Sequence, residues 1–217
     1  MKPLLITIDG PAGAGKTTVS RNLARKLGYR YLDTGALYRA VALKVVENKV
    51  LSDQDLEEIC RNLTISLVQK DGVFRLFSNG EDVTDKIRTE EISMMASKIS
   101  AKPVVRKALL SLQREIGEKK GVVAEGRDMG TVVFPDADIK FFLDASTETR
   151  ALRRYHELGL QSSQALKQLE DRIRKRDKND SSRDLAPLKA AHDAVIIDST
   201  KLSAEQVVEQ MMEYIFE

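Results

Sequence analysis

LLITIDGPAGAGKTT, residues 4–18, carries the strongest structural signal in this chain. Its first part, LLITI, is a short apolar run with almost no alternation, which is typical of a strand buried on both faces of a parallel sheet. The next part, GPAGAGKT, matches the pattern G-x-x-x-x-G-K-[ST] in full, and a helical pattern, KTTVSRNLARKLG (16–28), follows it. A strand, a glycine-rich loop and a helix in this order predict a loop that binds the phosphates of a nucleotide.

The chemistry of this loop fits a nucleoside triphosphate with Mg²⁺. Glycines let the chain turn tightly and direct backbone N–H groups toward an anion, and the following helix N-terminus adds positive potential. Lys16 can reach the β- and γ-phosphates, and the hydroxyl group of Thr17 can hold Mg²⁺. A turn that binds nothing is the alternative, but loop, lysine, hydroxyl and flanking elements all agree with a nucleotide site. The residues predicted to bind ATP are Gly10, Pro11, Ala12, Gly13, Ala14, Gly15, Lys16, Thr17 and Thr18.

Four further short runs complete the predicted sheet. GVVA (121–124), IKFFL (139–143) and AVII (194–197) are apolar apart from Lys140, and YRYLD (29–33) is a shorter candidate. Helical patterns separate these runs, and alternation of strand and helix predicts an α/β fold with a parallel sheet. We expect a doubly wound, three-layer core with five parallel strands, in which ligands bind at the carboxyl ends of the strands.

One segment breaks this alternation. In LTISLVQKDGVFRLFSNGEDVT (63–84), two β-rich runs flank Asp71-Gly72, which is a strong hairpin signal. We therefore predict a small antiparallel insertion over residues 62–102, within a core formed by residues 1–61 and 103–217.

Composition limits the possible partners. The chain has 217 residues, of which 42% are hydrophobic and 31% are charged, and its net charge is +2. Such a balance gives no general attraction to nucleic acid or to a membrane surface, and no apolar run has transmembrane length. The single cysteine, Cys60, cannot form an intramolecular disulfide, which fits a reducing cytoplasm. We expect a cytoplasmic monomer with no nucleic-acid or membrane partner.

The class of nucleotide-binding protein can be narrowed from the motifs. A GTPase switch would carry an N-K-x-D guanine motif, which the sequence lacks, and a mechanical ATPase is usually larger. A kinase for a small substrate remains, and it needs a second anion site that faces the first. A nucleotide-dependent regulator without enzymatic activity is the alternative from another class, and it would need no acceptor site.

Three segments can supply the second anion site. DTGALYR (33–39) and EGRDMG (125–130) each follow a predicted strand, and RIRKRDKNDSSRD (172–184) is an arginine-rich stretch at the end of a long helix. Each segment also has a plainer interpretation: a helix cap, a local ion pair and a solvated charged face, respectively. The first two lie at strand ends beside the phosphate loop, which favours the functional interpretation.

Together these motifs resemble those of bacterial cytidylate kinases. The resemblance runs nearly end to end through GPAGAGKTT (10–18), DTGALYRA (33–40), DVTDKIRTEEIS (82–93), GRDMGTVVFPDADIKFFLDAS (126–146) and RDKNDSSRDLAPL (176–188). Many proteins share the loop, whereas GRDMGTVVFPDA is highly specific. The resemblance implies transfer of the γ-phosphoryl group of ATP to CMP or dCMP, with Mg²⁺, in pyrimidine nucleotide metabolism.

The resemblance also implies roles for segments and single residues. Residues 62–102 would bind the monophosphate, and a lid at residues 149–165 would carry arginines. The residues implied in catalysis are Lys16, Arg127, Arg150, Arg153 and Arg154. The residues implied to bind CMP are Thr34, Arg106, Asp128 and Arg183 near the cytosine, Ser97, Arg176 and Asp180 near the sugar, and Tyr38, Arg39 and Arg127 near the phosphate, with Asp33 in the same set.

Within this family resemblance, the chemistry of the base favours CMP over UMP. Asp128 can accept a hydrogen bond from the N4 amine of cytosine, and Arg106 can donate to N3 and O2. Uracil would place O4 against the carboxylate and N3–H against the guanidinium group, and such mismatches give strong discrimination. Kinases of the same fold that act on shikimate, dephospho-coenzyme A or thymidylate form the nearest alternative.

Overall fold

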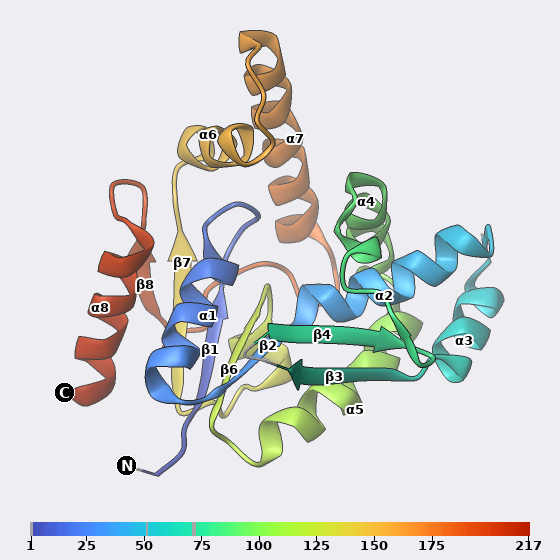
Figure 1. Ribbon diagram of the computed structural model, residues 1–217, viewed down its shortest axis with the longest axis horizontal. Helices are drawn as coiled ribbons and strands as arrows, with labels where there is room; N and C mark the ends of the chain where they lie inside the picture. Colours follow the sequence, from blue (N-terminus) through green and yellow to red (C-terminus); the bar gives the residue numbers. More distant parts are fainter. Residues whose placement is uncertain (1, 51, 71–72) are drawn as a thin grey trace. The chain divides into compact units, whose positions relative to one another are not determined.

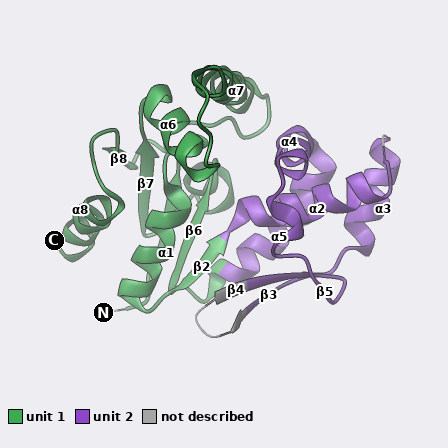
Figure 2. Ribbon diagram, turned by 45° about the horizontal axis from the view of Figure 1, so that its top comes forward, with its two compact units in different colours: residues 1–32, 117–217 green, residues 33–116 purple. Residues whose placement is uncertain are grey.

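The structure, a computed structural model, describes residues 2–50, 52–70 and 73–217. The chain forms two compact units, drawn in green and purple in Figure 2. Unit 1 contains residues 1–32 and 117–217, and unit 2 contains residues 33–116.

Unit 1 is built on a five-stranded sheet with β1 (Leu5–Asp9) at its centre. The strand order is β2-β6-β1-β7-β8, and the pairs β1–β6, β1–β7 and β7–β8 are parallel. The other strands are β2 (Arg30–Asp33), β6 (Val122–Gly126), β7 (Ile139–Asp144) and β8 (Val195–Asp198). The predicted α/β fold is confirmed, since each of the five predicted runs forms a strand of this sheet.

Burial of the strands follows their place in the sheet. Every residue of β1 and β6 is buried, as expected for apolar strands with a parallel neighbour on each side. β8 differs, because Ile196 on this edge strand is 68% exposed. An apolar run such as AVII (194–197) suggests burial on both faces, and this interpretation is wrong here, because β8 follows β7 at the margin of the sheet.

Strands are added on both sides of β1, so the order in which the chain builds the sheet reverses there. From β1 it continues to β2 at one edge, whereas β7 and β8 lie on the other side of β1. Ligands of doubly wound sheets bind at the carboxyl ends of the strands beside such a reversal. Asp9 and Gly126, the last residues of β1 and β6, are register partners. The phosphate loop and the segment from Arg127 onward therefore leave the sheet side by side.

Helices α1 and α8 pack against each other beside this sheet (Figure 1). The ring of Tyr214 in α8 lies edge-on to that of Phe141 in β7, with centroids 5.8 Å apart. The predicted helix over residues 16–28 is confirmed, because Gly28 ends α1, and at α8 Ser203 forms a capping box with Gln206. The helical elements of unit 1 are α1 (Lys16–Leu27), the π turn η2 (Met129–Val133), α6 (Thr147–Glu157), α7 (Ser163–Ser182) and α8 (Ala204–Phe216).

Unit 2 contains the small antiparallel sheet. β3 (Ile65–Lys70) pairs with β4 (Val73–Ser78), and β4 pairs with β5 (Glu81–Asp82). The predicted antiparallel segment is confirmed, and its predicted turn at Asp71-Gly72 lies outside the described residues. The helical elements here are α2 (Thr34–Glu47), α3 (Asp53–Asn62), the short 3-10 turn η1 (Lys86–Arg88), α4 (Glu90–Ile99) and α5 (Pro103–Glu118), whose last residues belong to unit 1.

Unit 2 is larger than the predicted insertion, because α2 packs against both α3 and α4 and so joins the same compact body. The boundaries 62–102 for a monophosphate-binding segment stay a prediction. None of the helices in the described part of the chain is both long and apolar enough to cross a lipid bilayer.

Candidate active site

The phosphate loop, residues 10–17, joins β1 to α1 in unit 1. Gly15, with φ 92°, precedes the helix, and Lys16 is the first residue of α1. Lys16 is 6% exposed, and its Nζ atom donates a hydrogen bond of 2.7 Å to the carbonyl oxygen of Pro11. Thr17 and Thr18 are exposed on the first turn of the helix. The loop therefore lies at a helix N-terminus with the Thr17 hydroxyl accessible, which is the setting that a phosphate site needs.

Two glycines of the loop lie where a side chain would meet a close neighbour. A Cβ atom on Gly10, whose φ is 149°, would come within 1.9 Å of the carbonyl oxygen of Leu143 in β7. A Cβ atom on Gly13, whose φ is 79°, would come within 3.1 Å of the Cβ atom of Arg150 in α6. The loop is therefore packed closely against both β7 and α6.

Two arginines of α6 hold the loop by its carbonyl groups. The Nη1 atom of Arg150 donates a hydrogen bond of 3.0 Å to the carbonyl oxygen of Ala12. The Nη1 atom of Arg153 donates one of 3.4 Å to the carbonyl oxygen of Ala14, which also accepts one from the Ser199 hydroxyl at 3.3 Å. These two predicted lid arginines thus contact the donor loop directly.

Arg150 is the more deeply fixed of the predicted lid arginines. It is 4% exposed, its Nε atom donates to the carbonyl oxygen of Ala145 at 2.8 Å, and its Nη1 atom pairs with Asp177 of α7 at 2.6 Å. Arg154 instead pairs with Glu157 of its own helix at 2.8 Å, with a side chain that is 39% exposed. The three arginines predicted as one set therefore differ in their surroundings.

Lys16 is electrostatically coupled to the predicted acceptor side. Burial is the main cause that lowers its pKa to about 7, and the positive charge of Arg127 adds to this effect. The carboxylates of Glu125 and Asp9 act in the opposite direction. The register agrees with this effect, because Arg127 directly follows Gly126, the partner of Asp9 at the start of the phosphate loop.

Five predicted CMP-binding residues gather in one cluster of ion pairs in unit 1. Arg127 donates from Nε to Asp180 at 3.1 Å, and Arg176 lies 4.0 Å from the same carboxylate oxygen. Arg183 lies 3.8 Å from Asp128, which is buried. Arg176 and Asp180 come from α7, Arg183 directly follows that helix, and the other two follow β6. The arginine-rich stretch is thus not a purely solvated face, because it forms ion pairs with the segment that follows β6.

The remaining predicted CMP-binding residues belong to unit 2. Asp33 caps α2 by accepting from the N–H of Ala36 at 2.9 Å, and its other carboxylate oxygen pairs with Arg39 at 2.8 Å. The guanidinium group of Arg106 lies 6.0 Å from the ring centroid of Tyr38. Thr34 is buried at the start of α2, and Ser97 lies on α4, which packs against α2. The helix-cap interpretation of Asp33 is therefore correct as well.

The sequence reasoning missed three buried polar residues beside this site. Asp9 accepts hydrogen bonds from the backbone N–H groups of Met129 and Gly130. The hydroxyl of Tyr31 in β2 donates to Glu125 at the end of β6, and both side chains are buried. A carboxylate at the end of an otherwise apolar strand is the one sequence signal that could have found Asp9 and Glu125.

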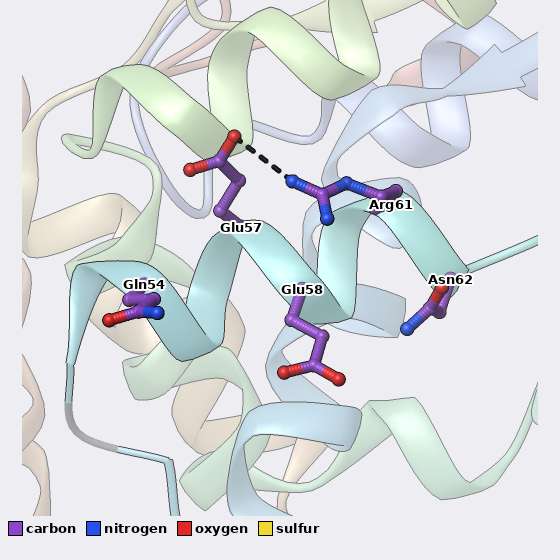
Figure 3. Close-up of a pocket in the computed structure, with 5 residues that line it drawn as sticks. All are labelled: Gln54, Glu57, Glu58, Arg61 and Asn62. Atoms are coloured by element: carbon purple, nitrogen blue, oxygen red, sulfur yellow. Dashed lines mark hydrogen bonds and ion pairs between the residues drawn. The ribbon is translucent and has the colours of Figure 1, made fainter.

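A pocket lies on the surface of α3 (Figure 3). All of its lining side chains are polar and come from this one helix, and Glu57 pairs with Arg61 at 3.4 Å. The lining residues are Gln54, Glu57, Glu58, Arg61 and Asn62. None of them is a predicted site residue, and the pocket is given no function.

Comparison with known proteins identifies the family. The profile of the family described as cytidylate kinase matches residues 6–217. A cytidylate kinase of Citrifermentans bemidjiense is 52% identical over 213 residues, which cover 96% of this chain and 91% of that protein. A cytidylate kinase of Geobacter sulfurreducens is 50% identical over 211 residues, with the same coverage of 96% and 91%.

A solved structure supports the fold. The structure of a shikimate kinase from Acinetobacter baumannii in complex with shikimate has a TM-score of 0.51 and 19% identity, covering 99% of this chain and 94% of that chain. At this identity the likeness shows the fold alone, whereas the family profile and the two relatives extend over nearly the whole sequence. The chain therefore belongs to the cytidylate kinase family and is a phosphotransferase with a phosphate group as acceptor.

Proposed function

We propose that this chain transfers the γ-phosphoryl group of ATP to CMP or dCMP, and releases ADP with CDP or dCDP. The observation that carries the proposal is that a complete phosphate loop with Lys16 leaves the sheet beside the segment that begins at Arg127, in a chain of the cytidylate kinase family. A regulator that only binds ATP would have no need for the ion-pair cluster next to the loop.

Positioning and positive charge supply the catalysis in this proposal. The transition state of phosphoryl transfer is loose and rich in negative charge, so it is stabilised mainly by fixed cations and N–H donors. Lys16 and the loop N–H groups hold the donor phosphates, and Arg127 and the lid arginines Arg150, Arg153 and Arg154 add positive charge around the transferred group. A phosphate oxygen of CMP is already nucleophilic near neutral pH, so no general base is required.

Mg²⁺ is proposed to arrive with ATP. The hydroxyl group of Thr17 is exposed on the first turn of α1 and can serve as one ligand, and the remaining ligands would be phosphate oxygens and water. In the described part of the chain, no group of three or more His, Cys, Asp or Glu side chains is placed to hold a metal ion. Bound Mg²⁺ would neutralise charge on the phosphates, while the side chains above orient them.

CMP is proposed to contact residues of both units. From unit 1 these are Arg127, Asp128, Arg176, Asp180 and Arg183, and from unit 2 they are Asp33, Thr34, Tyr38, Arg39, Ser97 and Arg106. Asp128 is proposed to accept from the N4 amine of cytosine and Arg106 to donate to N3 and O2, which selects CMP over UMP. The proposal also includes a monomer in the cytoplasm, with no nucleic-acid or membrane partner, and it is supported by the balanced charge of the sequence.

Product identification tests this function directly. The protein is mixed with ATP, Mg²⁺ and one acceptor at a time, with CMP, dCMP, UMP, AMP, GMP, dTMP, shikimate and dephospho-coenzyme A as the acceptors, and the products are identified by mass spectrometry. CDP and dCDP are expected as the main products. Faster phosphorylation of any other acceptor, or none of CMP, contradicts the proposal.

The Arg127→Gln variant separates a kinase from a regulator in the same assay. Its turnover of CMP should fall by about a hundredfold or more, because it removes charge from the transition state. Unchanged turnover in this variant argues against the proposed role of Arg127.

A further inference from the structure

Asp9 is the last residue of β1 and lies directly before Gly10, the first residue of the phosphate loop. It is only 3% exposed, and its register partners in the sheet are Gly126 on one side and Phe142 on the other. A carboxylate in the interior of a sheet loses its hydration, so protein groups must replace the water. The groups that donate hydrogen bonds to Asp9 therefore indicate why this position carries a carboxylate.

Both carboxylate oxygens of Asp9 accept backbone N–H groups from one turn. Oδ1 accepts from Met129 at 2.9 Å, and Oδ2 accepts from Gly130 at 2.7 Å. Met129 and Gly130 open the π turn η2, and the first N–H groups of any helical turn have no partner inside it. The preceding residue, Asp128, makes no side-chain cap. Asp9 thus caps this turn from another strand, 120 residues away in sequence.

The capped turn directly follows two residues of the ion-pair cluster. Arg127 and Asp128 lie between the end of β6 and the start of η2, so their backbone is held at both ends. Asp128 has φ −147° and ψ 25°, which is outside the helical region. The direction of its side chain therefore depends on where the Met129 peptide is held.

Burial of the Asp9 carboxylate is unfavourable, because the charged group loses its hydration. Burial is the main cause that raises the pKa of Asp9 to about 6, and the nearby charge of Asp128 acts in the same direction. The two N–H groups and the charge of Lys16 favour the ionised form and limit the shift. An apolar residue would fill a buried strand position without this cost, but it could not hold the turn.

We propose that Asp9 is a positioning residue for the acceptor: its carboxylate holds the N–H groups of Met129 and Gly130, and so places Arg127 and Asp128 next to the phosphate loop. The inference rests on the proposed function, because CMP is the substrate that those two side chains would contact. If Asp9 were only a structural cap, its loss would lower the free energy of unfolding. The ratio of KM for CMP to KM for ATP would then stay unchanged.

The Asp9→Asn variant tests this proposal because it keeps the size of the side chain. Its amide can accept only one of the two hydrogen bonds, and its NH₂ group would face the other backbone N–H. The measurements are kcat and KM for CMP, UMP and ATP. We expect KM for CMP to rise by about tenfold or more and the preference for CMP over UMP to fall, because misplacement of about 1 Å can cost a hundredfold in rate. KM for ATP should change much less.

Asp138→Asn is the matched control, because Asp138, which directly precedes β7, makes the same kind of contact with the opposite end of β1. Asp138 accepts from the N–H of Leu5, the first residue of β1, at 2.7 Å. It belongs to no part of the proposed site, so both KM values and the CMP preference should stay close to those of the wild type. If Asp9→Asn behaves like this control, or raises KM for ATP as much as KM for CMP, the positioning role is wrong.

Gly130→Ala tests the same contact from the other side, and decides the matter if Asp9→Asn does not fold. A Cβ atom on Gly130 would lie 3.1 Å from the Thr7 hydroxyl and 3.2 Å from the Lys140 side chain, so either these side chains or the turn must give way by a few tenths of an ångström. A crystal structure of the variant shows which of them moves. If the turn is displaced from Asp9, KM for CMP should rise, and if the turn stays in place, KM for CMP should stay unchanged; the opposite result in either case overturns the proposal. A wild-type protein that does not phosphorylate CMP would instead refute the proposed function itself.

Discussion

The Nζ atom of Lys16 donates a hydrogen bond of 2.7 Å to the carbonyl oxygen of Pro11, in the same loop. The amine is therefore turned toward the protein backbone in a buried setting, and burial together with Arg127 lowers its pKa to about 7. A triphosphate bound to the loop would bring several negative charges to this amine. Opposite charge favours the protonated form, so nucleotide binding should raise the pKa of Lys16 again.

Proton uptake on ATP binding is the first prediction. At about pH 8.5 the amine of Lys16 is mostly neutral in the free protein, so binding of MgATP should take up close to one proton. The affinity for ATP should accordingly fall as the pH rises above about 7, because protonation then has to accompany binding. Calorimetry in buffers with different enthalpies of ionisation measures the uptake.

The Lys16→Arg variant is the control for this experiment. Arginine stays protonated throughout this pH range, so the linked uptake should disappear even where binding is weaker. Equal proton uptake by the variant and the wild type would place the titrating group elsewhere.

Asp128 carries the second prediction, on the choice of base. In Asp128→Ala the acceptor for the N4 amine is lost, and the ratio of kcat/KM for CMP to that for UMP should fall by about tenfold or more. In Asp128→Asn the side-chain NH₂ can donate to O4 of uracil, so the ratio should fall further through a gain with UMP. Steady-state kinetics with both acceptors measures the ratio. A CMP preference that survives both substitutions shows that another residue reads the base.

Arg150 and Arg154 form a matched pair for the third prediction. Arg150→Gln leaves Asp177 and the carbonyl oxygens of Ala12 and Ala145 without their buried partner, so the free energy of unfolding should fall by about 3 kcal/mol. KM for ATP should rise as well, since Ala12 lies in the loop. Arg154→Gln removes a partly exposed pair with Glu157 and should cost about 0–1 kcal/mol. Urea unfolding measures the free energy of unfolding of both variants. Equal decreases would contradict the conclusion that the two arginines differ in their surroundings.

Gly10 carries the fourth prediction, on the close packing of the loop. In Gly10→Ala the new Cβ would lie 1.9 Å from the carbonyl oxygen of Leu143, which belongs to a central strand and cannot move aside. We expect a loss of more than about 4 kcal/mol or failure to fold. Gly159→Ala is the control, because Gly159 also has positive φ, 62°, but a Cβ there meets nothing within 4 Å. It should cost about 1–2 kcal/mol in thermal unfolding, and similar losses in both variants would refute the packing argument.

The sequence predicts the elements of this fold well because their signals are local. Four of the five strands contain short apolar runs, and the interior strands β1, β6 and β7 have a neighbour on each side in the sheet. The caps at Gly28 and Ser203 lie within a few residues of the groups they satisfy. The exposure of Ile196 was not predictable from its run, because the strand order decides which strand lies at the edge.

The candidate site was predicted in outline from the loop and from the arginine-rich stretch, but its internal connections were not. The partners of Asp9 lie more than a hundred residues away along the chain, and only the parallel register of β1 with β6 brings them together. The resemblance to cytidylate kinases implies that Arg150 and Arg153 are lid residues, whereas their contacts with the loop carbonyls depend on how α6 packs. Hydrogen bonds of this kind follow from topology and leave no periodic pattern in the sequence.

The carbonyl groups of Ala12 and Ala14, held by Arg150 and Arg153, share planar peptide units with the N–H groups of Gly13 and Gly15. In a trans peptide unit these two groups point in opposite directions, so an arginine that fixes the oxygen behind the loop also aims the N–H at its front. The donors are thus preorganised when the protein folds, and an arriving nucleotide does not have to offset the entropy of ordering them. Helix α6 thus supports the phosphate loop from behind, and we expect the rigidity of that helix to influence the affinity for a nucleotide.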